Sequence, residues 1–176
     1  DSSALSSLVT VDISAELDLE ILLSTAQSDS EYSFDEDWAN LGLCGNADPA
    51  DCYWYSSFDE YLRDTGTDTL DIRLISEFPP NGIGWVVGLY GKNQNADLVR
   101  NYKYTDPFTP ESTSIFSSAH ESQNAAVYGE ITLPTTTTAT QIRLGLRVES
   151  FNSEYSDSLA QTTDTDETLV GGHLTY

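Results

Sequence analysis

The stretch that decides the fold reads Val9-Thr10-Val11-Asp12-Ile13-Ser14-Ala15-Glu16-Leu17-Asp18-Leu19-Glu20-Ile21. Apolar and polar side chains alternate at every position, which is typical of a β-strand with one buried face and one wet face. A helix would spread the same apolar residues around its axis and leave no apolar stripe. The alternation predicts a single unbroken strand over 9–21, which at about 3.3 Å per residue would be roughly 40 Å long.

Other segments show the same period of two. Residues 70–78 and 85–89 predict a β-hairpin, with Pro79-Pro80-Asn81-Gly82 as its turn, and residues 127–133 and 142–148 predict a second one. A last alternating segment runs from Val170 to Tyr176. We therefore expect an all-β fold, an antiparallel immunoglobulin-like or jelly-roll sandwich, because repeated helical crossovers are missing from the sequence.

The remaining segments are expected to be helical or irregular. Short helices are predicted at 57–64 and 112–120, where apolar residues fall on one side of a helical turn. Long surface connections are predicted at 28–37, 91–121 and 152–167, which are mostly polar. These expectations leave one compact body, since a chain of this length is about the size of one domain.

Composition limits the classes of function. The 176 residues carry 7 Lys+Arg against 29 Asp+Glu, a net charge of −22, which excludes nucleic acid as a partner because phosphates need basic side chains. No apolar run approaches the ~20 residues of a membrane-spanning helix, so a mature chain without a membrane span is predicted. The sequence contains no Met, which suggests export and a removed signal peptide. The acidity is typical of a saline habitat, where stability rises with ionic strength.

The predicted first strand is too long for a body of this size. Strands in compact domains usually have about 3 to 10 residues, and no Gly before Gly42 or Pro before Pro49 marks a bend. We therefore expect residues 1–14 to leave a body formed by 15–176 and to pair with the open sheet of a neighbour. Repeated from subunit to subunit, this head-to-tail contact would build a filament.

Two segments carry a resemblance to a known family. Ser7-Leu8-Val9-Thr10-Val11-Asp12-Ile13-Ser14-Ala15-Glu16-Leu17-Asp18-Leu19 and Gly171-Gly172-His173-Leu174-Thr175-Tyr176 resemble the first and last strands of donor-strand-exchange pilins of the chaperone–usher kind. Biofilm fibre subunits of the camelysin type also polymerise through N-terminal strands. The resemblance implies a cell-surface homopolymer of identical subunits with an assembly chaperone. The implied donor residues are Leu5, Val9, Val11, Ile13 and Ala15, and the implied groove residues are Val170, Leu174 and Tyr176.

Few residues suggest a bound group. Cys44 and Cys52 enclose a polar, turn-forming loop and predict a local disulfide, with unlinked thiols in a reducing cell as the alternative. No cofactor is expected apart from calcium, for which one acidic cluster offers oxygen ligands without EF-hand spacing. A hydrated acidic surface explains that cluster equally well. The candidate ligands are Asp29, Glu31, Asp35 and Asp37.

Catalysis is not expected. His120 and His173 are the only imidazoles, and no nucleophile, zinc-protease or phosphate-loop motif is present. Carboxylate pairs such as Asp35 with Asp37 leave a glycosidase as an alternative. Aromatic residues beside the cysteine loop would either stack on a sugar or plug one end of the body; they are Trp38, Tyr53, Trp54, Tyr55, Phe58 and Tyr61.

The predicted function is therefore structural. We expect a non-enzymatic subunit of an extracellular filament that polymerises by donor-strand insertion and serves adhesion or a biofilm. The alternative is a secreted, monomeric, carbohydrate- or calcium-binding sandwich module.

Overall fold

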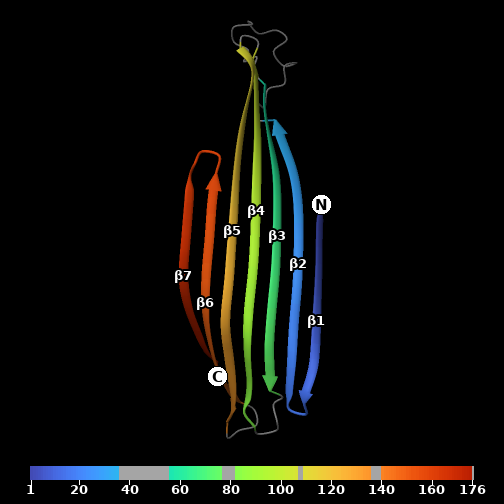
Figure 1. The fold of residues 1–176 in the computed structure, drawn as a ribbon, viewed down its shortest axis with the longest axis vertical. Coiled ribbons are helices and arrows are strands. Elements are labelled where there is room, and N and C mark those ends of the chain that lie inside the picture. Colours follow the sequence, from blue (N-terminus) through green and yellow to red (C-terminus); the bar gives the residue numbers. More distant parts are fainter. Residues whose placement is uncertain (36–55, 77–81, 107–108, 136–139, 176) are drawn as a thin grey trace.

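The computed structural model describes residues 1–35, 56–76, 82–106, 109–135 and 140–175. These residues form one antiparallel sheet of seven strands, in which each strand pairs with the next along the chain (Figure 1). The strands are β1 (Ser2–Ser14), β2 (Leu17–Asp35), β3 (Ser56–Ser76), β4 (Gly84–Asp106), β5 (Thr109–Pro134), β6 (Gln141–Asp157) and β7 (Thr162–Thr175). The all-β antiparallel prediction is confirmed. The sandwich prediction is wrong, because the described residues form a single layer.

The predicted strand over 9–21 is in fact a hairpin. Val9 pairs with Ile21 and Val11 pairs with Leu19, so β1 folds back on β2 of the same chain. From Ser2 to Asp12, the residue numbers of each cross-strand pair add up to 30, so an odd-numbered residue of β1 pairs with an odd-numbered residue of β2. Odd-numbered residues of both strands therefore lie on one face, and the alternation continues through the turn without a break. Ala15 and Glu16 make the turn after a register shift between Asp12 and Ser14, without a glycine or a positive φ. No sequence signal of a turn was therefore present.

The two hairpins predicted further along the chain are confirmed. Leu74 pairs with Val87 between β3 and β4, and Val127 pairs with Val148 between β5 and β6. The predicted helices are wrong, since 57–64 lies in β3 and 112–120 lies in β5. The predicted connections are largely strand as well: the described parts of 28–37 and 91–121 belong to β2, β4 and β5, and 152–157 belongs to β6. These segments are mostly polar, and their few apolar residues do not alternate over a long enough run to mark a strand.

The strands differ in length at one end of the sheet. β2, β3, β4 and β5 continue beyond β1, β6 and β7 (Figure 1). We call this the extended end, and we call the opposite end, where Ala15 and Glu16 join β1 to β2, the turn end. The shorter strands β1, β6 and β7 end before the extended end. The start of β1 lies beside the middle of β2, where the Asp29 amide donates to the Asp1 carbonyl at 2.7 Å. The chain turns from β6 into β7 at the same side, and Ala160, with φ 62°, lies in this turn.

The sheet has almost no hydrophobic core. Ala126, 6% exposed, is the only buried apolar residue in the part of the chain that the structure describes. Large aliphatic side chains are open instead, among them Leu5 at 71%, Val170 at 70% and Leu174 at 71% exposure. A chain of this size that folds in water buries about two thirds of its surface around a core. The apolar surface of this sheet must therefore be covered by something other than the described residues.

Glycines allow long side chains to lie flat across the sheet. The ring of Tyr128 on β5 passes over Gly88 on β4, and its hydroxyl donates to Asp71 on β3 at 2.6 Å. A Cβ added to Gly88 would collide with the Tyr128 ring. Gly145 on β6 is covered in the same way by His173 of β7, which contacts Glu130 of β5 at 3.0 Å. Each contact ties together strands that are not neighbours.

We predict that Gly88→Val displaces the Tyr128 ring and breaks its hydrogen bond to Asp71. The expected cost is about 1–2 kcal/mol in the free energy of unfolding, measured by denaturant titration. Gly171→Val is the matched control, because Gly171 lies in the same cross-strand row and has open space above it. Equal losses in the two variants would contradict the prediction.

Candidate functional site

One face of the sheet carries a continuous row of aliphatic side chains. Each of the seven strands contributes one member, and each member is the direct cross-strand partner of the next. We call this the central row, and the face that carries it the belt face. The central row consists of Val9, Ile21, Ile72, Leu89, Val127, Val148 and Val170.

The central row lies within a wider apolar belt. On either side of it, alternate belt-face positions are occupied by Leu, Val, Ile, Ala, Gly, Trp, Ser or Thr, and none of the described strands places a charged residue there. The belt extends from the pair Leu23–Leu70 to the pair Trp85–Ile131, about 20 Å along the strands. Its upper margin reaches Leu5 on β1, and its lower margin reaches Leu133 on β5. The belt therefore runs obliquely to the strands, as it does where strands are tilted.

The belt face is more exposed than the face behind it. Along β6, Leu144, Leu146 and Val148 are 42%, 59% and 42% exposed, whereas Arg147 and Glu149 between and beyond them are only partly exposed. A protein folded in water normally turns its apolar positions inward. This sheet has the reverse arrangement over residues 144–157 of β6.

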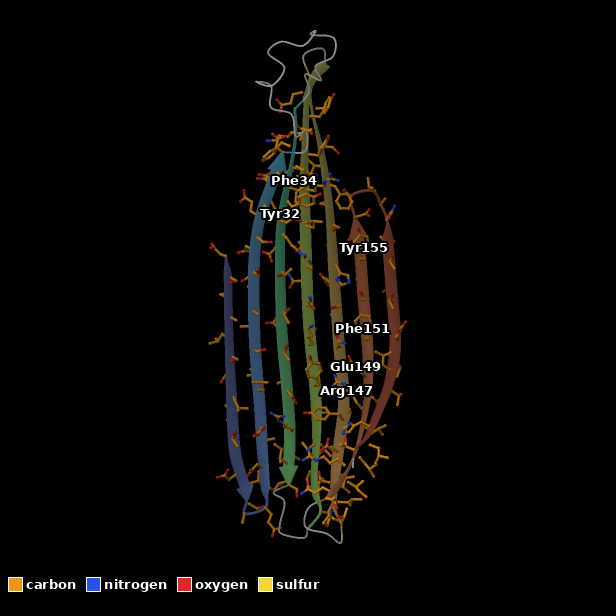
Figure 2. All side chains as sticks on the ribbon, turned by 180° about the vertical axis from the view of Figure 1, so that it is seen from behind. Tyr32, Phe34, Arg147, Glu149, Phe151 and Tyr155 are labelled. Carbon is orange, nitrogen blue, oxygen red and sulfur yellow. The ribbon has the colours of Figure 1, made fainter. Side chains whose placement is uncertain are left out.

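The opposite face, which we call the network face, carries paired polar groups at the level of the belt. Arg73 contacts Glu20 at 2.7 Å, and Arg147 contacts Glu149 at 2.8 Å while its guanidinium lies 4.8 Å from the centre of the Tyr90 ring. Asn124 donates to Glu149 from the neighbouring strand. Figure 2 labels Arg147, Glu149, Phe151 and Tyr155, which all lie on this face of β6.

Charge is divided between the two faces. The register places Arg63, Arg73, Lys92, Arg100, Arg143 and Arg147 on the network face, and only Lys103 on the belt face, near the extended end. Above the belt, every strand or the residue just before it carries a carboxylate on the belt face. These carboxylates include Asp1, Asp29, Glu31, Asp35, Glu60, Asp64, Asp68, Asp97, Glu121, Glu154, Asp164 and Asp166.

Three of these aspartates are direct cross-strand neighbours. Asp29 pairs with Asp64, and Asp64 pairs with Asp97. The pKa of Asp64 is raised from its ordinary value, first by a hydrogen bond with the Asp29 carboxyl, then by desolvation and by the charges of Asp29 and Asp97. Like charges directly opposite each other destabilise a sheet, so this row favours a shared proton or a compensating cation in solution.

The extended end holds a charge pair of a different kind on the network face. Asp59 is fully buried, and both of its carboxylate oxygens accept from Nε of Arg100 at 2.9 Å. Tyr61 donates to the same carboxylate at 3.2 Å, and the Arg100 guanidinium lies 5.4 Å from the Tyr61 ring centre. Burial and the Asp59 charge raise the pKa of Tyr61. Tyr32 stacks on Tyr61 at 4.9 Å, and Phe34 lies at 6.0 Å (Figure 2).

The structure places the predicted donor and groove residues at opposite edges of one sheet. Leu5, Val9, Val11 and Ile13 lie on the belt face of β1, and Ala15 lies in the turn. Val170 and Leu174 lie on the belt face of β7, across five intervening strands, and Tyr176 lies outside the described residues. Both groups prove to be parts of the same belt, a role that alternation alone did not identify.

The predicted metal and disulfide residues are only partly described. Asp29, Glu31 and Asp35 lie at alternate positions of β2 on the belt face, and Asp37, Cys44 and Cys52 lie outside the described residues. No group of three or more His, Cys, Asp or Glu side chains is placed to hold a metal within the described ranges. Of the predicted aromatic cluster, Phe58 and Tyr61 are described and point to opposite faces of β3. The two histidines lie apart on the network face, where His120 contacts Ser153 at 2.9 Å.

Comparison with known proteins identifies the fold. The chain is similar to the ferric yersiniabactin uptake receptor FyuA from Yersinia pestis (TM-score 0.58, 16% identity) and to the siderophore receptor PiuA from Acinetobacter baumannii (TM-score 0.61, 13% identity). It is also similar to the ferric citrate transporter FecA (TM-score 0.57, 11% identity). In each case 98% of this chain is covered, but only 24%, 29% and 24% of FyuA, PiuA and FecA respectively.

The likeness is to part of the barrel domain of TonB-dependent outer-membrane receptors. The chain spans less than a third of the length of the three receptors named above. No protein-family model matches the sequence, and no curated protein matches it. In the described part of the chain, no helix is long and apolar enough to cross a membrane.

These findings overturn the filament interpretation. The resemblance to pilins is wrong, because nearly the whole chain matches receptor barrel strands and the N-terminal strand pairs with β2 of its own chain. The predicted extracellular filament location and the sandwich module offered as its alternative are wrong on the same ground. The filament and the sandwich were both inferred from the alternation of apolar and polar residues. Alternation shows that a strand has two unlike faces, but it does not show which of them meets the solvent.

We predict that Arg100→Ala is more damaging than Arg73→Ala. Removal of the Arg100 guanidinium takes away hydrogen bonds and a positive charge from the buried Asp59 carboxylate, and this is expected to cost on the order of 3 kcal/mol in the free energy of unfolding. Arg73 and Glu20 are partly exposed, with 37% and 23% of their side chains accessible, so the control variant should lose about 1 kcal/mol or less. Denaturant titration measures both, and a loss from Arg73→Ala as large as that from Arg100→Ala would refute the ranking.

The aspartate row predicts a pH dependence. Because the pKa of Asp64 is raised in the folded state, that state binds the proton more tightly than the unfolded chain, and stability rises as pH falls through the raised pKa. Asp64→Asn lacks this rise and is expected to be more stable than the wild type at neutral pH. Thermal unfolding at a series of pH values tests this. Asp29→Asn should have the same effect on stability, and the double variant should be little more stable than either single variant. The assignment would be contradicted if the wild type lost stability relative to Asp64→Asn as acidification begins.

Proposed function

We propose that these strands form part of the wall of an outer-membrane β-barrel, with the belt face toward lipid and the network face toward the lumen. The observation that carries the proposal is the uncharged aliphatic belt, which crosses all seven strands and is more exposed than the polar face behind it. Membrane barrels alternate apolar-outward and polar-inward residues in this way, over a band about 25 Å tall.

The energetics of the belt support a lipid environment. Each aliphatic side chain moved out of water contributes about 1.5–3 kcal/mol, and the central row alone supplies one from every strand. The backbone groups of the interior strands are satisfied within the ladders, which a hydrocarbon environment requires. In water the same sheet would expose a large contiguous apolar surface, and soluble monomers rarely do so.

Strand direction supports a larger barrel. In an antiparallel meander of seven strands, β1 and β7 run the same way, so they cannot close on each other as an antiparallel pair. A second copy placed around a common barrel axis would set β7 beside another β1 and create parallel seams. An odd number of further strands closes the barrel with antiparallel seams throughout, giving the even total usual for such proteins.

The proposed role is that of a receptor wall. The similar proteins named above are receptors and transporters, and we extend to this chain an uptake function of that general kind. Within this proposal the chain acts as a scaffold and surface, and it performs no covalent chemistry.

We predict that Leu89→Arg prevents or weakens insertion into lipid vesicles. An arginine in the middle of a lipid-facing strand costs about 2–4 kcal/mol, whereas the same change on an aqueous surface would be nearly neutral, since Leu89 is already 55% exposed. Asn93→Arg is the matched control, because it lies on the same strand and the same face above the belt. Folding into phosphatidylcholine vesicles, followed by protection from added protease, measures insertion.

The wild type and Asn93→Arg are expected to insert, and Leu89→Arg is expected to show a clear deficit. A Leu89→Arg variant as well inserted as the wild type would refute the membrane assignment. The open edges of β1 and β7 lower the yield of insertion for the wild type and both variants alike, so the comparison between them carries the test.

A further inference from the structure

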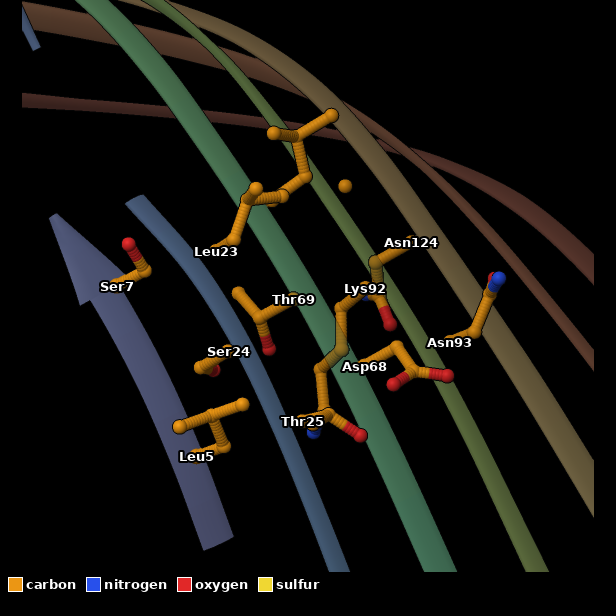
Figure 3. Close-up of a pocket in the computed structure, with 12 residues that line it drawn as sticks. Leu5, Ser7, Leu23, Ser24, Thr25, Asp68, Thr69, Lys92, Asn93 and Asn124 are labelled. Atoms are coloured by element: carbon orange, nitrogen blue, oxygen red, sulfur yellow. The ribbon is translucent and has the colours of Figure 1, made fainter. Parts of the chain in front are cut away.

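A shallow groove interrupts the upper margin of the belt. It has a volume of about 550 Å³ and extends from β1 to β5 (Figure 3). This volume lies in the range of small-molecule sites. Eight of its lining residues belong to the two belt-face rows at the margin, and four belong to the row between them on the network face: Ser24, Thr69, Lys92 and Asn124. The groove therefore opens on the belt face, where the belt gives way to the polar rows.

The apolar part of the groove is made by a missing side chain. Gly91 sits between Leu70 of β3 and Ala125 of β5 in one cross-strand row, and nothing lies within 4 Å of the place where its Cβ would be. Leu23 and Leu70 stand beside this gap, 53% and 38% exposed, and Leu5 closes the side at β1 with 71% exposure. The result is a strip of aliphatic surface with a floor of backbone.

The rim of the groove is polar and carries a negative charge. Thr25, Asp68 and Asn93 occupy the next belt-face row toward the extended end, and all three line the groove. They offer a hydroxyl, a carboxylate and an amide within one row. The basic residue nearest in sequence, Lys92, belongs to the network-face row. A group that binds at this rim would therefore meet acceptors and a net negative charge.

We propose that the groove binds one membrane lipid. An acyl chain lies along Leu23, Leu70 and the open floor at Gly91, and an ammonium-bearing headgroup donates to Asp68 at the rim. The proposal rests on the membrane function proposed above, since the groove is continuous with the belt and lies where the belt would end at the headgroups. The ammonium is chosen on charge, because the belt face above the groove carries carboxylates.

Two other occupants fit the groove less well. A second copy of the chain presents the same acidic margin, so like charges would face each other. A free polar solute would leave the aliphatic strip of Leu5, Leu23 and Leu70 uncovered. A lipid satisfies both halves of the groove with one molecule.

The test compares lipid retention by the refolded chain in native mass spectrometry. The protein is released from detergent micelles containing phosphatidylethanolamine or phosphatidylglycerol of the same acyl chains. The wild type is expected to retain one phosphatidylethanolamine in preference to phosphatidylglycerol. Gly91→Leu fills the groove without a steric clash and should lower the apparent affinity by about tenfold or more. Gly171→Leu, which also has open space above it but lies on the network face of β7, should retain the lipid.

A further variant, Asp68→Asn, should abolish the preference between the two headgroups while the acyl chain still binds. The proposal is overturned if Gly91→Leu retains lipid as the wild type does, if both lipids bind equally to the wild type, or if no lipid stays bound. When any of these results accompanies normal insertion of the wild type into vesicles, the groove assignment fails and the membrane function stands. When Leu89→Arg inserts as well as the wild type, both fail together.

Discussion

The apolar side chains of the belt face have no partner within the described chain, and the rest of the architecture follows from this. A single sheet satisfies its backbone hydrogen bonds along its ladders, but it cannot cover its own faces. One face here carries an uncharged aliphatic belt across every strand, and the other carries ion pairs and hydrogen bonds at the same level. An environment that is apolar on one side and aqueous on the other satisfies both faces, and a membrane barrel provides it.

The same constraint accounts for the unusual charge distribution. A net charge of −22 is compatible with an uncharged belt only if charge is confined to the network face and to the rows beyond the belt. Basic residues are used almost entirely on the network face, where Arg73, Arg100 and Arg147 pair with carboxylates. Glycines at Gly88 and Gly145 let tyrosine and histidine side chains bridge alternate strands on that face. The network face thus carries ion pairs and hydrogen bonds at the level of the belt, while the carboxylates of the belt face above the belt form a strongly acidic surface.

The pilin-like interpretation failed at one turn. Ala15 and Glu16 reverse the chain without glycine, proline or asparagine, and the odd-numbered residues of β1 and β2 fall on the same face, so a hairpin was read as one tall strand. The excessive length then suggested a donor strand. The polar extensions of β2, β4 and β5 were misread in the opposite sense, as loops, because a strand with two wet faces has no hydrophobic period.

The sequence by itself determined which alternating segments are strands, the antiparallel pairing at two hairpins, and the partition of side chains such as Leu144, Arg147 and Val148 between two faces. These properties are local, since they depend on the period of two and on short turns. Only the tertiary structure decided that all seven apolar stripes align in one row, that no second layer covers them among the described residues, and that Val9 and Val170 belong to one belt. Register between strands and the direction in which a face points are set by contacts distant in sequence, and alternation is the same whether the apolar side meets a protein core or lipid.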